Sequence, residues 1–252
     1  MISRAGLTAM RQVGPILLLL VVWQVAVVAL HVPEWLLPPP TTIAGGLIAN
    51  SGVLLSATLQ TVSEAVAGFI GGNLLAVAGA FLLVRWSSLR TSVLPLAVGL
   101  RSVPLVAIAP VLTLLFGFGS LTMVVMASLL TFFPALVNGM VGLEAVSADQ
   151  IRLFRSLAAS DWLVFRRLRI PVALPYLFAA FKVTAPASVL GAMVAEWAAS
   201  NGGLGYVILD AADAYRLGLM WAAVAVATLV ALLAFVLASV AERRVIFWPV
   251  TA

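Results

Sequence analysis

Long apolar runs alternate with short polar intervals along this chain, and each run is about as long as a membrane-spanning helix. A helix needs about 20 predominantly apolar residues to cross a bilayer. The runs that meet this length cover residues 13–30, 55–84, 93–116, 121–140, 172–194 and 219–240. The pattern therefore predicts an all-α, polytopic membrane protein with about six transmembrane helices. We expect residues 1–252 to form a single transmembrane domain.

The only long polar interval covers residues 144–171, between the fourth and fifth predicted spans. Within it, Ser147 is followed three residues later by Gln150, a capping-box pattern that predicts the start of a helix. Ser160 predicts the N-cap of a second helix, and Asp161 suits the positive end of that helix's dipole. We therefore expect two short amphipathic helices, joined near residues 158–160.

Each of these two helices is predicted to have an apolar stripe. The first stripe comprises Ile151, Phe154, Leu157 and Ala158, and the second comprises Trp162, Phe165 and Leu168. Pro171 is expected to end the unit, because proline interrupts a helix. The stripes allow two interpretations: the helices lie on anionic lipid, or they dock on a cytoplasmic partner.

The basic residues predict how the chain is oriented. With the polar interval on the cytoplasmic side, eleven of the fourteen basic residues lie on that side, as the positive-inside rule demands. Both termini are then cytoplasmic. The proline-rich stretch 31–50 becomes an outer loop with one short interfacial helix, residues 117–120 form an outer turn, and the glycine-rich stretch 198–218 forms an outer or re-entrant loop.

Four ionisable residues fall inside or at the ends of the predicted spans: Glu64, Arg101, Lys182 and Glu196. Charged groups at membrane depth are costly, and they usually face a pathway or a partner. We therefore expect these four to line or gate a translocation path. For Arg101 the alternative is that it lies near the inner interface and extends its charge to water. The pair Gly68 and Gly72 predicts close packing of helices in the bundle.

Composition narrows the function classes. The chain is 63% hydrophobic and only 9% charged, which excludes a soluble domain. The net charge of +5 comes from arginines at span ends and is not a nucleic-acid signal. There is no cysteine, and a single histidine, His31, is too few for a histidine-based metal site or for an intramembrane hydrolase. No phosphate-binding Gly-x-x-x-x-Gly-Lys-Ser/Thr motif occurs, so any ATP must be bound by another chain.

The polar interval resembles the coupling loop of binding-protein-dependent ABC importer permeases, whose pattern is Glu-Ala-Ala, three residues, Gly, nine residues, Ile, one residue, Leu-Pro. Anchored at Ile170-Pro171, this spacing puts Leu168 at the Ile position. It puts Ala158 at the turn glycine and Arg152 at the leading acid, and both are departures from the pattern. The segments that match outside the interval are LLPPPTTI at 36–43, RSVPLVAIAPVLTLLFGFG at 101–119 and AEWAASNGGLGYVI at 195–208. Together these segments resemble the nitrate/sulfonate/taurine branch, which includes permeases for thiamine-precursor pyrimidines.

The resemblance implies a non-catalytic pore subunit in a bacterial cytoplasmic (inner) membrane. Two copies of the chain would form the pore, most simply as a homodimer, and a periplasmic or lipid-anchored binding protein would deliver a small polar solute. Two ATPase subunits, which hold ATP and Mg²⁺, would each grip one loop. The residues implied in this contact are Ile151, Arg152, Phe154, Arg155, Leu157, Ala158, Ala159, Ser160, Asp161 and Pro171. The alternative function is a non-transporting membrane scaffold or sensor whose loop recruits a cytoplasmic partner.

Overall fold

The computed structural model describes residues 4–86, 99 and 104–248, and the elements in this part of the chain are all helices. From the N-terminus they are α1 (Arg4–Ala29), α2 (Pro40–Ala49), α3 (Ser51–Arg85), α5 (Leu105–Phe116), α6 (Ser120–Glu144), α7 (Ala148–Ser156), α8 (Asp161–Val164), the π-helical turn η1 (Phe165–Arg169), α9 (Ile170–Ala199), α10 (Gly203–Asp213) and α11 (Leu217–Val245). Arg101 and the first part of the predicted third span lie outside the described residues.

Four of the described helical segments are long and apolar enough to cross a membrane. They are Ser51–Arg85, Ser120–Glu144, Asp161–Ala199 and Leu217–Val245. Two further helices coincide with the remaining predicted spans: α1 has 26 residues, and α5 covers the end of the run 93–116. The all-helical, multi-span architecture is therefore confirmed.

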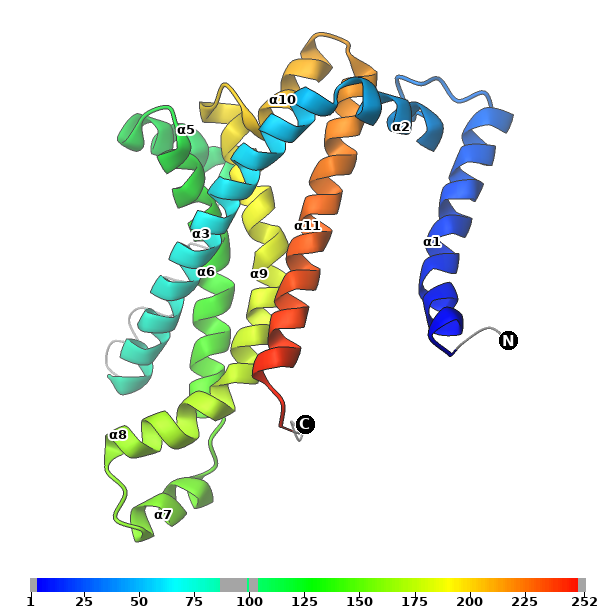
Figure 1. The fold of residues 1–252 in the computed structure, drawn as a ribbon. Helices are drawn as coiled ribbons and strands as arrows, with labels where there is room; N and C mark the ends of the chain where they lie inside the picture. Colours follow the sequence, from blue (N-terminus) through cyan, green and yellow to red (C-terminus); the bar gives the residue numbers. More distant parts are fainter. Residues whose placement is uncertain (1–3, 87–98, 100–103, 249–252) are drawn as a thin grey trace.

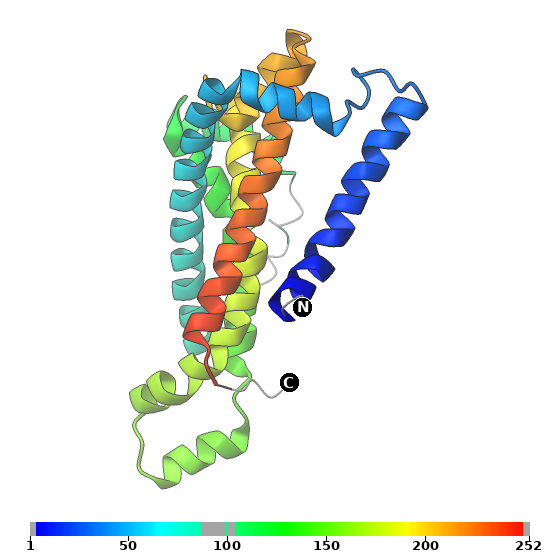
Figure 2. The same cartoon turned by 45° about the vertical axis from the view of Figure 1, so that its right-hand side comes forward.

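The body of the protein is a bundle in which α6 packs against both α3 and α9, and α11 packs against α9 (Figure 1). At one end of the bundle lie α2 and α10, and at the other end α7 and α8 project beyond the long helices. The first helix, α1, stands apart from the bundle in both views and is joined to it through α2 (Figure 2). The chain thus carries its polar loop at one end and a cap of short helices at the other.

Small residues bring α3 and α6 into close contact, as the Gly68 and Gly72 spacing predicts. A Cβ atom on Gly68 would lie 2.9 Å from the carbonyl oxygen of Val124, and one on Gly72 would lie 2.5 Å from that of Ser128. The Ser128 hydroxyl donates to the carbonyl oxygen of Gly68 at 3.2 Å. The two backbones therefore approach as closely as glycine allows, which is how helices associate in lipid.

Two predictions from the sequence are wrong, one about a loop and one about the end of a helix. The stretch 198–218 is mostly helical, because α10 occupies Gly203–Asp213. Pro171 does not end the second loop helix: α8, η1 and α9 form one continuous helical run from Asp161 to Ala199. The π-helical turn explains the second error. Pro171 lies in the first turn of α9, directly after this wider turn, so its missing N–H does not break the run.

Candidate functional site

The first loop helix, α7, begins with the capping box that the sequence predicts. The Gln150 amide donates to Ser147 Oγ at 3.2 Å, and the Ser147 amide donates to Gln150 Oε1 at 3.0 Å. Two of the backbone N–H groups at the start of the helix are thereby satisfied by side chains within four residues. The start of α7 therefore needs no contact with the rest of the bundle.

The end of α7 is a Schellman turn built on Ala158. The Ala159 amide donates to the Phe154 carbonyl at 3.1 Å, and the Ala158 amide donates to the Arg155 carbonyl at 3.0 Å. Ala158 has φ of +54°, in the left-handed region that glycine adopts without strain. Alanine thus holds the backbone conformation of a turn glycine, although the sequence departs from the family pattern here.

Replacing Ala158 with glycine should stabilise this turn by about 1 kcal/mol, because alanine is strained in the left-handed region. Hydrogen exchange of the α7 amides should then slow by about fivefold in the full chain. The matched control is Ala159→Gly, one residue later and outside the left-handed region, which should not slow exchange. Equal exchange rates in Ala158→Gly and the wild type would show that the turn is not strained.

The second loop helix is joined rigidly to the membrane bundle. Ser160 Oγ accepts a hydrogen bond from the Leu163 amide at 3.3 Å, which confirms the predicted N-cap. From Asp161 the helical run continues without interruption to Ala199. The run changes direction between α8 and α9, where the π-helical turn lies, but remains helical throughout (Figure 1). The loop is therefore connected to the fifth span by continuous helix, with no intervening coil.

The loop exposes large apolar side chains beyond the end of the bundle. Leu157 is 73% exposed, Trp162 is 64% exposed and Leu153 is 60% exposed. Ile151 and Phe154 are half-buried, and in the second helix Val164 and Leu168 are buried. Some side chains of the two predicted stripes therefore pack against the protein, whereas others are exposed and no described residue covers them. Leu153 was missed, although its spacing of four from Leu157 places both on one face.

The remaining predicted loop residues lie around these helices. Arg152 forms an ion pair with Asp149, one turn earlier in α7, and both side chains are largely exposed. Arg152, which stands where the family pattern has an acid, is thus paired with an acid of its own helix. Arg155, Ala158, Ser160 and Asp161 are exposed, whereas Ala159 and Pro171 are half-buried.

A cluster of buried polar groups lies at the opposite end of the bundle, centred on Glu196. This side chain is fully buried. Its Oε1 atom accepts a hydrogen bond from Thr61 Oγ1 at 2.6 Å, and its Oε2 atom accepts one from the Gly205 amide at 2.6 Å. Thr61 Oγ1 in turn accepts from the Leu204 amide at 2.8 Å. Glu196 and Thr61 therefore cap the N-terminus of α10 from two other helices, α9 and α3.

Two glycines make room for this cap. Gly203 has φ of +88°, and a Cβ atom there would overlap the Glu196 carboxyl group. A Cβ atom on Gly205 would lie 2.9 Å from Glu196 Oε2. The Gly-Leu-Gly sequence is therefore needed for the carboxyl group to reach the first backbone N–H groups of α10.

Glu64 lies beside Glu196 and is also buried, with 2% of its surface exposed. Its Oε1 atom accepts a hydrogen bond from Gln60 Nε2 at 3.3 Å, while Oε2 has no hydrogen-bond partner among the described protein atoms. The Gln60 side chain also donates to Ser200 Oγ at 3.3 Å. The structure therefore brings together two of the four ionisable residues predicted in the spans.

Lys182 does not join this cluster. Its Nζ atom lies 2.7 Å from Glu242 Oε2, and both side chains are about three-quarters buried, at 28% and 25% exposure. This pair ties α9 to the end of α11 and neutralises both charges within the bundle. The sequence analysis identified Lys182 but not its partner, because Glu242 lies just beyond the last predicted span, 219–240, and 60 positions from Lys182.

These features define a class of protein: a multi-span helical bundle with an exposed apolar loop joined rigidly to a span that holds a buried polar cluster. The profile of the family described as "Binding-protein-dependent transport system inner membrane component" matches residues 68–247. The chain belongs to this family. It is therefore a permease component of a transport system that depends on a binding protein, embedded in the membrane through several helices.

Individual relatives agree with this family. The chain is 33% identical over 237 residues to the riboflavin transport system permease protein RibX of Chloroflexus aurantiacus, which covers 92% of this chain and 88% of the relative. It is 35% identical over 196 residues to the formylaminopyrimidine transport permease protein ThiX of Halalkalibacterium halodurans, covering 75% and 76%. It is 27% identical to the putative aliphatic sulfonates transport permease protein SsuC of Bacillus subtilis, covering 91% and 84%. The predicted branch is confirmed.

Proposed function

We propose that this chain forms the pore of an ATP-driven importer and moves a small polar solute from a binding protein to the cytoplasm. The observation that carries the proposal is the single helical run from Asp161 to Ala199. One end of this run bears the exposed loop, and the other end bears Glu196, which holds α10. A partner that moves the loop would therefore move α9. Through Glu196, this movement would reach α10 at the opposite end of the bundle.

The partner at the loop is a separate ATPase subunit that holds ATP and Mg²⁺. Leu153, Leu157 and Trp162 offer it an apolar surface, and such surfaces are expected to be buried in a complex. Two copies of the chain, one loop each, would be driven by two ATPase subunits. The basic residues at the loop end of the bundle support a cytoplasmic loop and cytoplasmic termini, in a bacterial inner membrane.

The solute that we propose is a small heterocycle of the pyrimidine or thiamine-precursor class. The relatives named for riboflavin and formylaminopyrimidine are 33% and 35% identical to this chain, and the relative named for aliphatic sulfonates is 27% identical. A sulfonate, taurine or nitrate remains the competing class, and uptake of labelled pyrimidine in the presence of each competitor distinguishes them.

Replacing Leu157 with aspartate should release the ATPase, because a charge would then have to be buried in an apolar contact. We expect an ATPase with a Walker motif to co-purify with the tagged wild-type chain in mild detergent. With Leu157→Asp we expect recovery to fall at least tenfold at equal abundance of the tagged chain. The measurement is quantitative mass spectrometry of the co-purified proteins.

The matched control is Ser156→Asp, which adds the same charge at the neighbouring exposed position. This variant should keep the ATPase, since Ser156 contributes no apolar surface. Full recovery of the ATPase with Leu157→Asp would contradict the docking role of the loop. Recovery of no ATPase with the wild-type chain would favour a scaffold or sensor subunit.

A further inference from the structure

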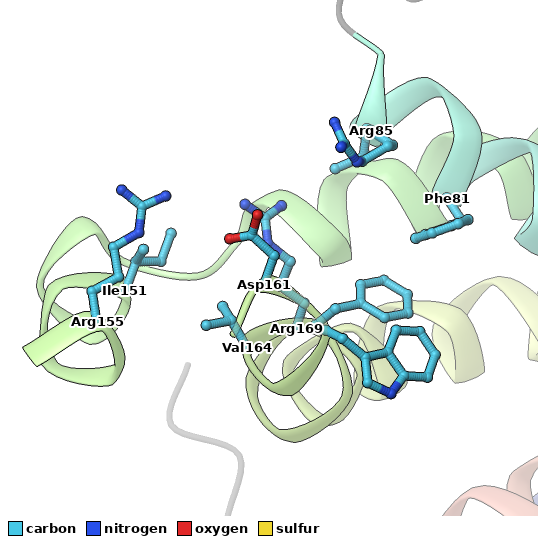
Figure 3. A pocket seen from close by; sticks show the side chains of 10 residues that line it. Phe81, Arg85, Ile151, Arg155, Asp161, Val164 and Arg169 are labelled. Carbon is cyan, nitrogen blue, oxygen red and sulfur yellow. The ribbon is translucent and has the colours of Figure 1, made fainter. Parts of the chain in front are cut away.

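A pocket of about 340 Å³ lies where the polar loop meets the end of α3 (Figure 3). Its walls come from three separate segments: the last turns of α3, one side of α7, and the run of α8 and η1. Arg85 extends from α3, Arg155 from α7 and Arg169 from η1, and all three line the same space. The family resemblance assigns no ligand to this pocket.

The pocket carries an excess of positive charge. Three guanidinium groups line it together with a single carboxylate, that of Asp161. Arg169 donates from Nη1 to the Leu143 carbonyl oxygen at 3.2 Å. Arg85 and Arg155 form no ion pair with any acidic residue in the described part of the chain. Within the described residues these two guanidinium groups line the pocket without a salt bridge, and guanidinium groups bind phosphate oxygens in a bidentate manner.

The remaining wall is aromatic. Phe81 and Phe165 line it, with ring centroids 4.6 Å apart. Arg85 is the first charged residue after the apolar run of α3, so the pocket lies where a span leaves the membrane. A ligand here would contact guanidinium groups with one part and aromatic rings with another.

We propose that this pocket binds the phosphodiester head group of an anionic phospholipid. Arg85 and Arg155, which lie on opposite sides of the pocket (Figure 3), would turn toward the phosphate from either side, and the aromatic wall would contact the glycerol and the first acyl carbons. Basic pockets between helices on the cytoplasmic side of a membrane bind such head groups. A free phosphate fits less well, because it would leave the aromatic wall without a partner.

The bound head group would also fasten the loop. Among the described helices, α7 has no extensive contact with any other helix, so little protein holds it against the bundle. A phosphate held by Arg155 of α7 and Arg85 of α3 bridges these two elements. The lipid would therefore limit the positions that the exposed apolar side chains of the loop can adopt. Only the importance of this restriction depends on the proposed coupling function, whereas lipid binding itself does not.

Native mass spectrometry of the purified full chain tests the lipid site directly. The chain is titrated in detergent with phosphatidylglycerol and, in parallel, with phosphatidylcholine. The wild type should bind phosphatidylglycerol preferentially, because both lipids carry the phosphodiester but the cationic choline of phosphatidylcholine would be repelled by the arginines of the pocket. Arg85→Gln/Arg155→Gln should bind it about 30-fold more weakly, since each arginine close to the membrane surface contributes about fivefold. The control, Arg166→Gln/Arg167→Gln, removes the same charge from exposed positions outside the pocket and should bind as the wild type does.

A lysine variant and a competition experiment with inorganic phosphate cover the other outcomes. If the glutamine pair does not fold, Arg85→Lys/Arg155→Lys keeps the charge and should still weaken binding, because lysine lacks the guanidinium fork. Equal binding of the two lipids, or unchanged binding in the pocket variants, would overturn the proposal. Release of phosphatidylglycerol by millimolar inorganic phosphate would assign the pocket to a soluble anion instead. None of these readouts requires transport, so failure here is distinguishable from failure of the importer function.

Discussion

Replacing Glu196 with alanine should reduce solute uptake at least tenfold, because α10 would lose the carboxyl group that caps its N-terminus. The Gly205 amide and the Thr61 hydroxyl would both be left without their partner in a buried site. Each buried polar group without a partner costs about 1–3 kcal/mol. The measurements are uptake of labelled solute and limited proteolysis near α10. In Glu196→Ala, uptake should fall and cleavage near α10 should rise.

Two companion variants separate an anchoring role from direct contact with solute. Glu196→Gln keeps one acceptor oxygen and should retain an intermediate level of uptake. Asp213→Ala changes an exposed acid at the other end of α10 and should leave both uptake and proteolysis unchanged. If Glu196→Ala raised KM while α10 stayed as protected as in the wild type, Glu196 would bind solute and would not anchor the helix.

Replacing Gly72 with alanine should destabilise the bundle by about 1–3 kcal/mol, the usual range for an overpacked core. The added Cβ atom would overlap Thr131 Oγ1 and would lie 2.5 Å from the carbonyl oxygen of Ser128. Because one of these atoms belongs to the backbone of α6, the two helices must separate to accommodate it. Thermal unfolding of the purified chain in detergent should show a lower Tm, with a loss of uptake at higher temperature.

The neighbouring residue provides the control for this change. A Cβ atom on Gly71 would meet only Ser128 Oγ, at an ordinary contact distance of 3.5 Å. Gly71→Ala makes the same chemical change and gains the same helix propensity, about 1 kcal/mol. It should therefore leave Tm unchanged or raise it. Equal Tm values for the two alanine variants would refute the close approach of α3 and α6 at Gly72.

The ends of the loop helices could be predicted from a few adjacent residues. The capping box at Ser147 and the cap at Ser160 involve side chains and amides only three residues apart, so the sequence contains all the partners. The same reasoning wrongly predicted that the second loop helix ends at Pro171, because a proline after an ordinary helical turn ends a helix. Whether the preceding turn is α- or π-helical depends on packing that the local sequence does not encode.

Ala158 and Arg152 depart from the family pattern in residue type, and the structure shows what each does in this chain. Ala158 adopts the left-handed conformation that the pattern assigns to glycine. Arg152 pairs with Asp149 on the exposed side of α7, so its charge is balanced within the helix. The backbone of the turn is thus set by the Schellman hydrogen bonds, and the residue type alters only the strain in it.

The sequence by itself determined the spans and the position of the loop, because hydropathy and capping depend on neighbouring residues. Only the tertiary structure decided what the ionisable residues do. Glu196 meets Thr61 across 135 positions and Lys182 meets Glu242 across 60, and no local pattern predicts such partners. A buried charge is stabilised only by the groups packed around it. Those groups come from separate helices, so the role of each charge follows from the packing of the bundle.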